Sequence, residues 1–395
     1  MRIVKRQSWF SRIANSFVGA LFGGILTVVS LVLLFVNEGR AVKTARSLEE
    51  GSHLVQHVPH DSIAAEHESH LIHVQGPTFV EGDLTDEEFG VRVNAVRLQR
   101  IVEMYQWDED KEVEHRRRSG GTTERIEHYT YKKVWSSSLI NSRKFKESGH
   151  DNPGAFPISS RNQPSSAVYL GSFRFPSSLV DQIAYSNPFP VKLESVSDSL
   201  REKLQERGGE LYWPIDPAAT SAKIGDARIR FEVTMPIPVS VVAKQEGQWL
   251  NPYKTSNGRE LHMLSPGNVS AEQMFDKAKA TNTMLTWVLR GFGTLLSFAG
   301  LAMMLHVFSV MVDIVPFAGS IVGAGTGFIA FLMACIISLT TISIGWIVYR
   351  PLLGISLLAA AIACIVLLVK RLRQNKTVPA TMVAPPPVPT PPPLP

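Results

Sequence analysis

Cysteine is scarce in this sequence, and so are charged residues. Its 395 residues include two cysteines, Cys335 and Cys364, which both lie in apolar stretches, so no disulfide framework is expected. Only 19% of the residues are charged, below the roughly 25% that is typical of soluble proteins. The net charge of +5 comes without any basic run interleaved with aromatic residues, which argues against nucleic acid as a partner.

Sequence signatures of catalysis are also missing. No Gly-x-Ser-x-Gly elbow, phosphate-binding glycine loop or nicotinamide-binding glycine fingerprint occurs in a fitting context. Serine, histidine and carboxylate residues are present, but their spacing selects no triad. We therefore expect no catalytic residue and no cofactor.

Long apolar segments, in contrast, are prominent. Residues 17–36 carry no charge and are long enough to cross a hydrocarbon core of about 30 Å as a helix. A cleaved signal peptide is the alternative, because basic residues precede this segment; however, the segment exceeds the usual length of such a signal, and no small-x-small cleavage site follows it. Three further spans are predicted at 285–310, 317–344 and 352–369.

The charges that flank these segments predict an orientation. Four spans put both termini on one side, and basic residues at both ends place that side in the cytoplasm. Three more basic residues follow the first span, where the rule has little force because a long translocated domain comes next: Arg40, Lys43 and Arg46. The predicted order is a cytoplasmic basic N-terminus (1–16), span one (17–36), an extracytoplasmic domain (37–284), three spans (285–310, 317–344, 352–369) and a cytoplasmic basic and proline-rich tail (370–395).

The prolines of the tail predict a polyproline II segment, which serves as a spacer or as a ligand for a proline-recognising module.

The domain between the first two spans is predicted to be β-rich. Residues 227–235 alternate between apolar and polar side chains, as a half-buried strand does. Segments 102–113 and 123–135 flank a glycine-containing turn and predict a long hairpin. Residues 196–207 predict a helix that ends at two glycines, and Ser270 with Gln273 predicts a capping box for a helix that runs on into the second span. The predicted fold class is an α+β membrane protein.

Small residues at a spacing of four occur in the first and third spans, where they allow helix backbones to approach closely. They serve either packing within the four-helix unit or self-association, and they are Gly19, Gly23, Gly319, Gly323 and Gly327.

Six histidines fall within residues 53–73, and three of them have a spacing at which a helix could present them to a metal: His67, His70 and His73. A nearby proline and a strand-like pattern favour a polar, pH-sensitive surface instead, because a strand sends His70 and His73 to opposite faces. We therefore predict no metal site, with these three as weak candidates.

Several short peptides next to the spans resemble the transmembrane protein 43 (LUMA) family over residues 16–370. They are Asn37 to Ala41, Val102 to Trp107, Ile140 to Ser142, His150 with Asn152 and Pro153, Gly225 and Asp226 with Arg228, Gly345 with Trp346, and Tyr349 to Pro351. The resemblance implies one N-terminal and three C-terminal spans around a large luminal or periplasmic domain. It also implies a non-catalytic organiser of membrane protein complexes that associates with itself and with other membrane proteins.

The histidine-rich segment and the proline tail depart from the animal pattern of this family, and no eukaryotic retention signal is present. We therefore expect a bacterial member in the inner membrane; a eukaryotic member would lie in the endoplasmic reticulum or inner nuclear membrane.

The charged residues at the outer membrane interface predict an ion pair, in which Glu38 meets either Arg350 or Arg290. The leading functional hypothesis is a membrane scaffold. A channel or transporter component is the first alternative, because span three carries the hydroxyl residues Ser338, Thr340, Thr341 and Ser343. An extracytoplasmic hydrolase is the second.

Overall fold

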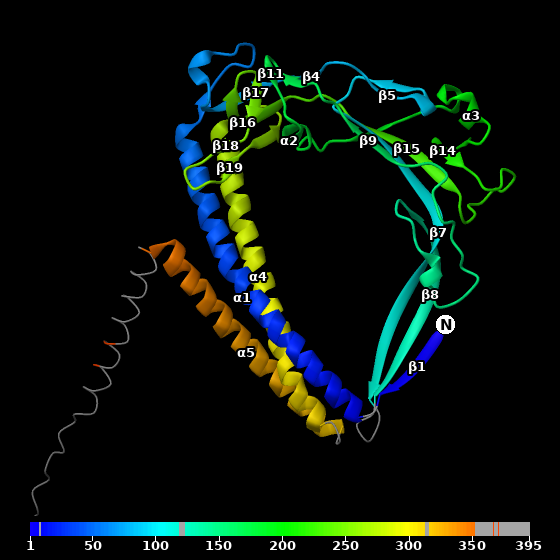
Figure 1. The fold of residues 1–395 in the computed structure, drawn as a ribbon, viewed down its shortest axis with the longest axis vertical. Helices are drawn as coiled ribbons and strands as arrows, with labels where there is room; N and C mark the ends of the chain where they lie inside the picture. The colour runs from blue at the N-terminus through cyan, green and yellow to red at the C-terminus, as the bar shows by residue number, and fades with distance from the viewer. Residues whose placement is uncertain (8, 118–122, 313–315, 352–365, 367–369, 371–395) are drawn as a thin grey trace, which may run out of the picture.

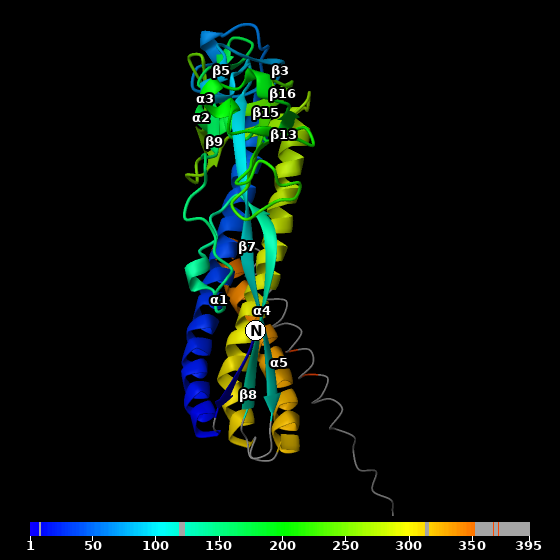
Figure 2. The ribbon, with the colours of Figure 1, turned by 90° about the vertical axis from the view of Figure 1, so that its right-hand side faces the viewer.

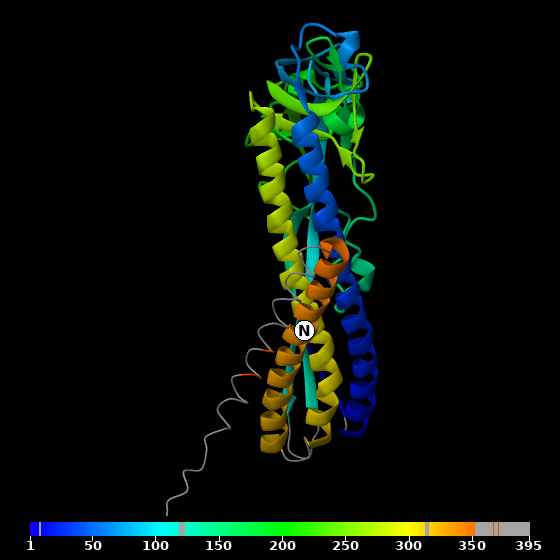
Figure 3. The same ribbon diagram turned by 90° about the vertical axis from the view of Figure 1, so that its left-hand side faces the viewer.

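The computed structural model describes residues 1–7, 9–117, 123–312, 316–351, 366 and 370. These residues form an open frame, with three long helices on one side, a long β-hairpin on the other and a β-rich head that joins them (Figure 1). Two views turned by 90° show that the frame is narrow (Figure 2 and Figure 3). The helices are α1 (Trp9–Leu54), α4 (Ala271–Val312) and α5 (Pro316–Tyr349).

Each long helix contains an apolar window that is long enough to cross a membrane. The helical segments that carry these windows contain the predicted spans at 17–36 and 285–310 and overlap the one at 317–344, so the described residues provide three candidate spans. The fourth predicted span, at 352–369, and the proline-rich tail lie outside the described residues.

Two of the helices extend well beyond their apolar windows into the head. α1 continues past residue 36 to Leu54, and α4 begins at Ala271. Ser270 and Gln273 exchange two hydrogen bonds of 3.3 Å, which confirms the predicted capping box. Residues 37–54 and 271–284 therefore form a two-helix stalk of about 25 Å, and the first strand after α1 begins at Gln56.

The first sheet of the head lies on top of the stalk. Its strand order is β2 (Gln56–His57), β3 (Leu71–Gly76), β16 (Val239–Glu246), β17 (Trp249–Asn251), β11 (Phe173–Arg174), β10 (Val168–Leu170) and β4 (Thr78–Val80), and β20 (Met263–Pro266) also pairs with β16. A short ladder of β18 (Tyr253–Lys254) and β19 (Glu260–Leu261) lies beside it. Leu71 and Val242 of this sheet pack against Leu48 of α1 and Phe275 of α4, so head and stalk share one apolar core.

The second sheet contains the long hairpin. Its strand order is β1 (Arg2–Gln7), β8 (Thr123–Ser136), β7 (Arg97–Arg117), β15 (Ala227–Thr234), β14 (Glu210–Trp213) and β13 (Gln205–Arg207), with β12 (Asn187–Phe189) on β15 and β9 (Arg161–Pro164) on β7. The pair β5 (Leu84–Asp86) and β6 (Val91–Val93) completes the head. The predicted strand at 227–235 and the predicted hairpin are confirmed as β15 and β7–β8.

The helix that was predicted at 196–207 is mostly absent, and only the short helix α3 lies in this range. The head contains α2 (Ser177–Val180) and α3 (Asp198–Arg201), and residues 205–207 are strand β13. The prediction was wrong because Gly208 and Gly209, with φ of 61° and 82°, form the tight turn from β13 to β14 instead of a helix cap.

The N-terminal strand pairs with the hairpin near its tip. β1 and β8 are antiparallel from Arg2 opposite His128 to Gln7 opposite Thr123. Within this ladder Glu127, opposite Ile3, is buried and binds Lys111 at 2.8 Å and Lys5 at 3.4 Å. Its hydrogen bond to Lys111 lowers the pKa of Glu127 to about 2. Strands that exchange hydrogen bonds occupy one compartment, which conflicts with an orientation that puts a bilayer between the N-terminus and residues 37–284.

Candidate functional site at the junction of the long helices

A buried ion pair joins the three long helices where their apolar windows end. Glu38 of α1 is 2% exposed, and Arg290 of α4 donates to both of its carboxylate oxygens over 2.7 Å. Trp346 of α5 donates to the same carboxylate at 3.0 Å. The Arg290 guanidinium also lies over the rings of Trp287 and Trp346. Bidentate pairing with an added N–H donor satisfies a carboxylate that water scarcely reaches.

Glycines at the same level let α5 approach α1. A Cβ at Gly345 would lie 2.9 Å from Cγ of Glu38, and one at Gly39 would lie 2.6 Å from the ring of Tyr349. The Tyr349 ring in turn packs on Phe35, with ring centroids 5.4 Å apart. The two helices can therefore hold Glu38 and Trp346 together only because side chains are missing at these positions.

A polar network continues the junction into the stalk. Arg40 donates to Asn282 and Thr286 of α4 at 2.9 Å, and its third partner is Asn37, one turn earlier on α1. Asn282 closes the network by donating to the carbonyl of Ala41 at 3.0 Å. Asn282 and Thr286 were not predicted as part of a site; their spacing of four, which places both on one helix face, was the available signal.

Of the two predicted partners of Glu38, the structure places Arg290 against it. No ion pair joins Arg350 to Glu38 among the residues that the structure describes. Arg350 follows the last turn of α5, where its backbone N–H donates to the carbonyl of Trp346. The neighbouring carbonyl of Tyr349 accepts a hydrogen bond of 2.9 Å from Arg46 of the stalk.

The glycines with a spacing of four have different surroundings. A Cβ at Gly23 would collide with the carbonyl of Gly300 on α4, and one at Gly323 would lie 3.0 Å from Oγ of Ser309. A Cβ at Gly19 or at Gly327 would meet no atom of the described residues within 4 Å. The surroundings of Gly319 lie outside the described residues. Gly23 and Gly323 thus face helices of the same chain, whereas Gly19 and Gly327 face outwards.

We expect Gly23→Leu to lower the free energy of unfolding by about 1–3 kcal/mol, because the added side chain forces α1 and α4 apart. Gly19→Leu, on the same helix but in open space, is the matched control and should change it by less than about 0.5 kcal/mol. Denaturant unfolding of both variants in one mild detergent measures the difference. Equal effects would show that the crossing at Gly23 is not tight.

The candidate metal-binding histidines make separate contacts. His67 hydrogen bonds with Gln56 at 2.8 Å, and His70 hydrogen bonds with the carbonyl of Glu68. His73 is 2% exposed in β3, lies 3.0 Å from His57 through their Nδ1 atoms and has its pKa lowered by burial. Among the described residues, no group of three histidine, cysteine or carboxylate side chains could hold a metal ion.

The fold and the junction together define a membrane protein in which long apolar helices, fixed by a buried polar cluster, carry a β-rich head on a stalk. Residues 104–351 match the family model described as Transmembrane protein 43. The chain belongs to this family, as the resemblance noted in the sequence predicted.

Curated relatives support the assignment over most of the chain. Transmembrane protein 43 of Mus musculus is 36% identical over 364 residues, which cover 88% of each chain. Its human counterpart is 35% identical and covers 90% of each, and the Drosophila melanogaster homologue is 30% identical over 86% of this chain and 91% of its own. No solved structure matches.

Proposed function

We propose that this protein is a non-catalytic, multi-pass membrane scaffold that organises membrane protein complexes through its head and by self-association. The proposal rests on a difference among the glycines of the spans: some lie against another helix of the chain, and others do not. Gly23 packs against α4 of the same chain, whereas the described residues leave the helix surfaces at Gly19 on α1 and Gly327 on α5 open. Such surfaces allow a second copy to approach closely within a bilayer, where packing drives helix association.

The junction supports the same proposal, because it fixes the helices relative to one another. Arg290 and Trp346 hold Glu38 from two different helices, and the stalk shares a core with the head. A rigid head at a fixed height above the apolar windows suits a protein that positions partners.

Replacing Gly19 and Gly327 together by leucine tests self-association. We expect the oligomeric fraction in native membranes to fall several-fold, as measured by cross-linking with mass spectrometry, while unfolding stays unchanged. Gly24→Leu with Gly325→Leu is the matched control, since these glycines lie on the same helices in open space but off the spacing of four. Recovery of monomers without neighbours, already for the native chain, would overturn the scaffold proposal.

The channel alternative gains no support from the hydroxyl residues of α5. Thr340, Thr341 and Ser343 each donate to the backbone carbonyl four residues earlier, and Ser338 is 2% exposed. Hydroxyls that bond their own helix are common in spans and do not indicate a polar lining. Ion flux through purified protein in liposomes would decide between the two, because a scaffold conducts none.

For the membrane-inserted chain we propose both termini in the cytoplasm and the head on the other side, with the bacterial inner membrane as the location. The basic residues at both ends support this orientation. The β1–β8 pairing argues against it, so we propose that the hairpin leaves β1 when the chain enters the membrane, because exposed charges such as Glu112 and Glu114 are not compatible with lipid.

A further inference from the structure

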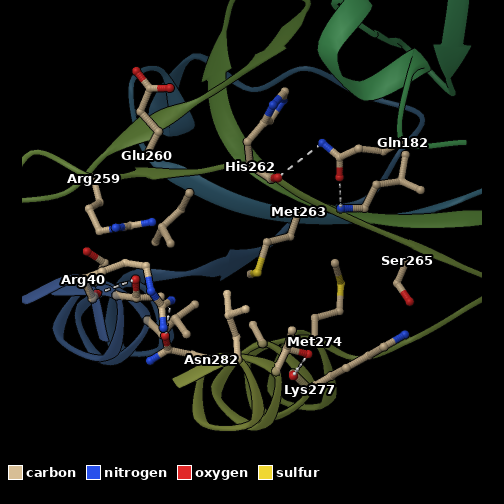
Figure 4. Close-up of a pocket in the computed structure, with 18 residues that line it drawn as sticks. Arg40, Gln182, Arg259, Glu260, His262, Met263, Ser265, Met274, Lys277 and Asn282 are labelled. Carbon is tan, nitrogen blue, oxygen red and sulfur yellow. Dashed lines mark hydrogen bonds between the residues drawn. The ribbon is translucent and has the colours of Figure 1, made fainter. Parts of the chain in front are cut away.

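A cavity of about 430 Å³ opens between the stalk and the head (Figure 4). Its walls come from α1, from α4 and from residues 259–265, which include β19 and β20, and Gln182 lies at one side. The volume falls within the range of about 300–1,000 Å³ that is usual for small-molecule sites. Three of its lining residues, Leu48, Leu261 and Met274, also belong to the core that the head and the stalk share.

The middle of the cavity is apolar. Met263 of β20 and Met274 of α4 point towards one another across it (Figure 4), and Leu48 and Leu261 also line it. Methionine side chains adapt to flexible apolar ligands, because they are unbranched and polarisable. This surface suits an acyl chain rather than a polar metabolite.

Cations flank the apolar middle. Arg40 and Arg259 lie at one side of it and Lys277 at the other (Figure 4). In the part of the chain that the structure describes, no ion pair is formed by Arg259 or Lys277, and both side chains are exposed. Arg40 donates to neutral oxygens of Asn37, Asn282 and Thr286.

The remaining titratable groups of the wall do not neutralise these cations. Glu260 supplies the one carboxylate among the described lining residues, and Figure 4 shows it turned away from Met263 and Met274. His262 hydrogen bonds with the carbonyl of Leu250 at 3.0 Å, and burial lowers its pKa, which keeps it neutral at pH 7. Three cations and one carboxylate therefore line the cavity among the described residues, and this excess of positive charge favours an anionic headgroup.

The lower end of the cavity reaches the apolar windows. Leu285, where the apolar part of α4 begins, lines it, and so does Arg40, which follows the apolar part of α1. The cavity therefore lies next to the parts of α1 and α4 that are predicted to enter the bilayer.

We propose that this cavity binds an anionic amphiphile, with the acyl chain against Met263, Met274 and Leu285 and the anionic headgroup between the basic side chains. Two kinds of ligand have a hydrocarbon chain that ends in a phosphate or carboxylate: an anionic membrane phospholipid and a free fatty acid. Separate probes distinguish them.

Native mass spectrometry of the full chain in a non-ionic detergent tests the proposal. The probes are dioleoyl phosphatidate, oleate and the zwitterionic dioleoyl phosphatidylcholine. We expect a one-to-one adduct with phosphatidate or with oleate at concentrations where phosphatidylcholine gives none. The anionic probe that binds identifies the source.

Two variants locate the adduct. Arg259→Gln with Lys277→Gln removes two exposed cations and should weaken binding about 30-fold. Thr281→Trp, at an exposed lining position, fills the cavity without changing charge and should abolish the adduct. Arg92→Gln removes an exposed cation from β6, outside the cavity, and is the matched control with unchanged binding.

Equal binding of phosphatidate and phosphatidylcholine, or no adduct with either anionic probe, would overturn the proposal. So would a full adduct in Thr281→Trp, or a loss in Arg92→Gln as large as in the double variant. None of these outcomes bears on self-association, so the failure of this proposal and that of the scaffold proposal can be told apart.

Discussion

Arg290→Gln should lower the free energy of unfolding by about 3–5 kcal/mol. The substitution leaves the Glu38 carboxylate, which is 2% exposed, with Trp346 as its remaining hydrogen-bond donor. A buried charge without a counter-charge is far more costly than the pair itself is stabilising. Denaturant unfolding of the full chain in a mild detergent, followed by tryptophan fluorescence, measures the loss.

A double-mutant cycle separates the ion pair from general damage to the junction. Glu38→Gln should also destabilise strongly, but Glu38→Gln combined with Arg290→Gln should be more stable than either single variant, because no unpaired charge remains. Arg97→Gln is the matched control, since its partner Asp181 is 68% exposed and the pair should contribute only about 0–1 kcal/mol. If Arg290→Gln lowered the free energy of unfolding no more than Arg97→Gln does, the ion pair at the junction would not stabilise the arrangement of the three helices.

Arg350→Gln completes the comparison of the two predicted partners. Since no described contact joins Arg350 to Glu38, this variant should change the free energy of unfolding by less than about 0.5 kcal/mol. A loss as large as that of Arg290→Gln would mean that Arg350 supports the Glu38 carboxylate after all.

The sequence predicted those features that depend on local pattern. The alternation at 227–235, the hairpin β7–β8 and the capping box at Ser270 each follow from neighbouring residues, and each is present. Local pattern gave a wrong prediction where the same residues fit two kinds of local structure. Gly208 and Gly209 suit the end of a helix as well as a hairpin turn. Pairing with β14 decided the outcome, and that strand partner is not visible in the local pattern.

The sequence predicted which charged residues lie at the junction, but it did not predict which of them pair. Position along the spans placed Glu38, Arg290 and Arg350 at one interface, but the choice of partner depends on how α4 and α5 are rotated about their axes. The sequence drew attention to Trp346 only through the family resemblance, and its hydrogen bond to Glu38 was not predicted. The cavity could not be predicted at all, because its walls come from segments that are far apart in the sequence and meet only when the head settles on the stalk.

In a sealed bilayer we expect β1 and β8 to separate, so that Lys5→Cys and Arg125→Cys form no disulfide. These positions are directly opposite in the ladder, which brings their Cβ atoms close enough for a disulfide while the strands are paired. The ladder keeps exposed charges of the hairpin level with the apolar windows, where each would cost about 3 kcal/mol or more in lipid. The proposed orientation and the β1–β8 ladder therefore exclude each other.

The measurement is gel mobility after oxidation of vesicles that contain the full chain with Cys335→Ser and Cys364→Ser. Asp108→Cys with Lys132→Cys is the matched control: these residues are opposite within the hairpin itself, so this pair should cross-link whatever the orientation. An impermeant maleimide should then label Lys5→Cys and the head variant Arg92→Cys from opposite sides. If residues 5 and 125 cross-linked as completely as the control pair, the N-terminus and the hairpin would lie in one compartment. A bilayer cannot separate two strands that are hydrogen-bonded to each other, so this result would contradict a cytoplasmic N-terminus.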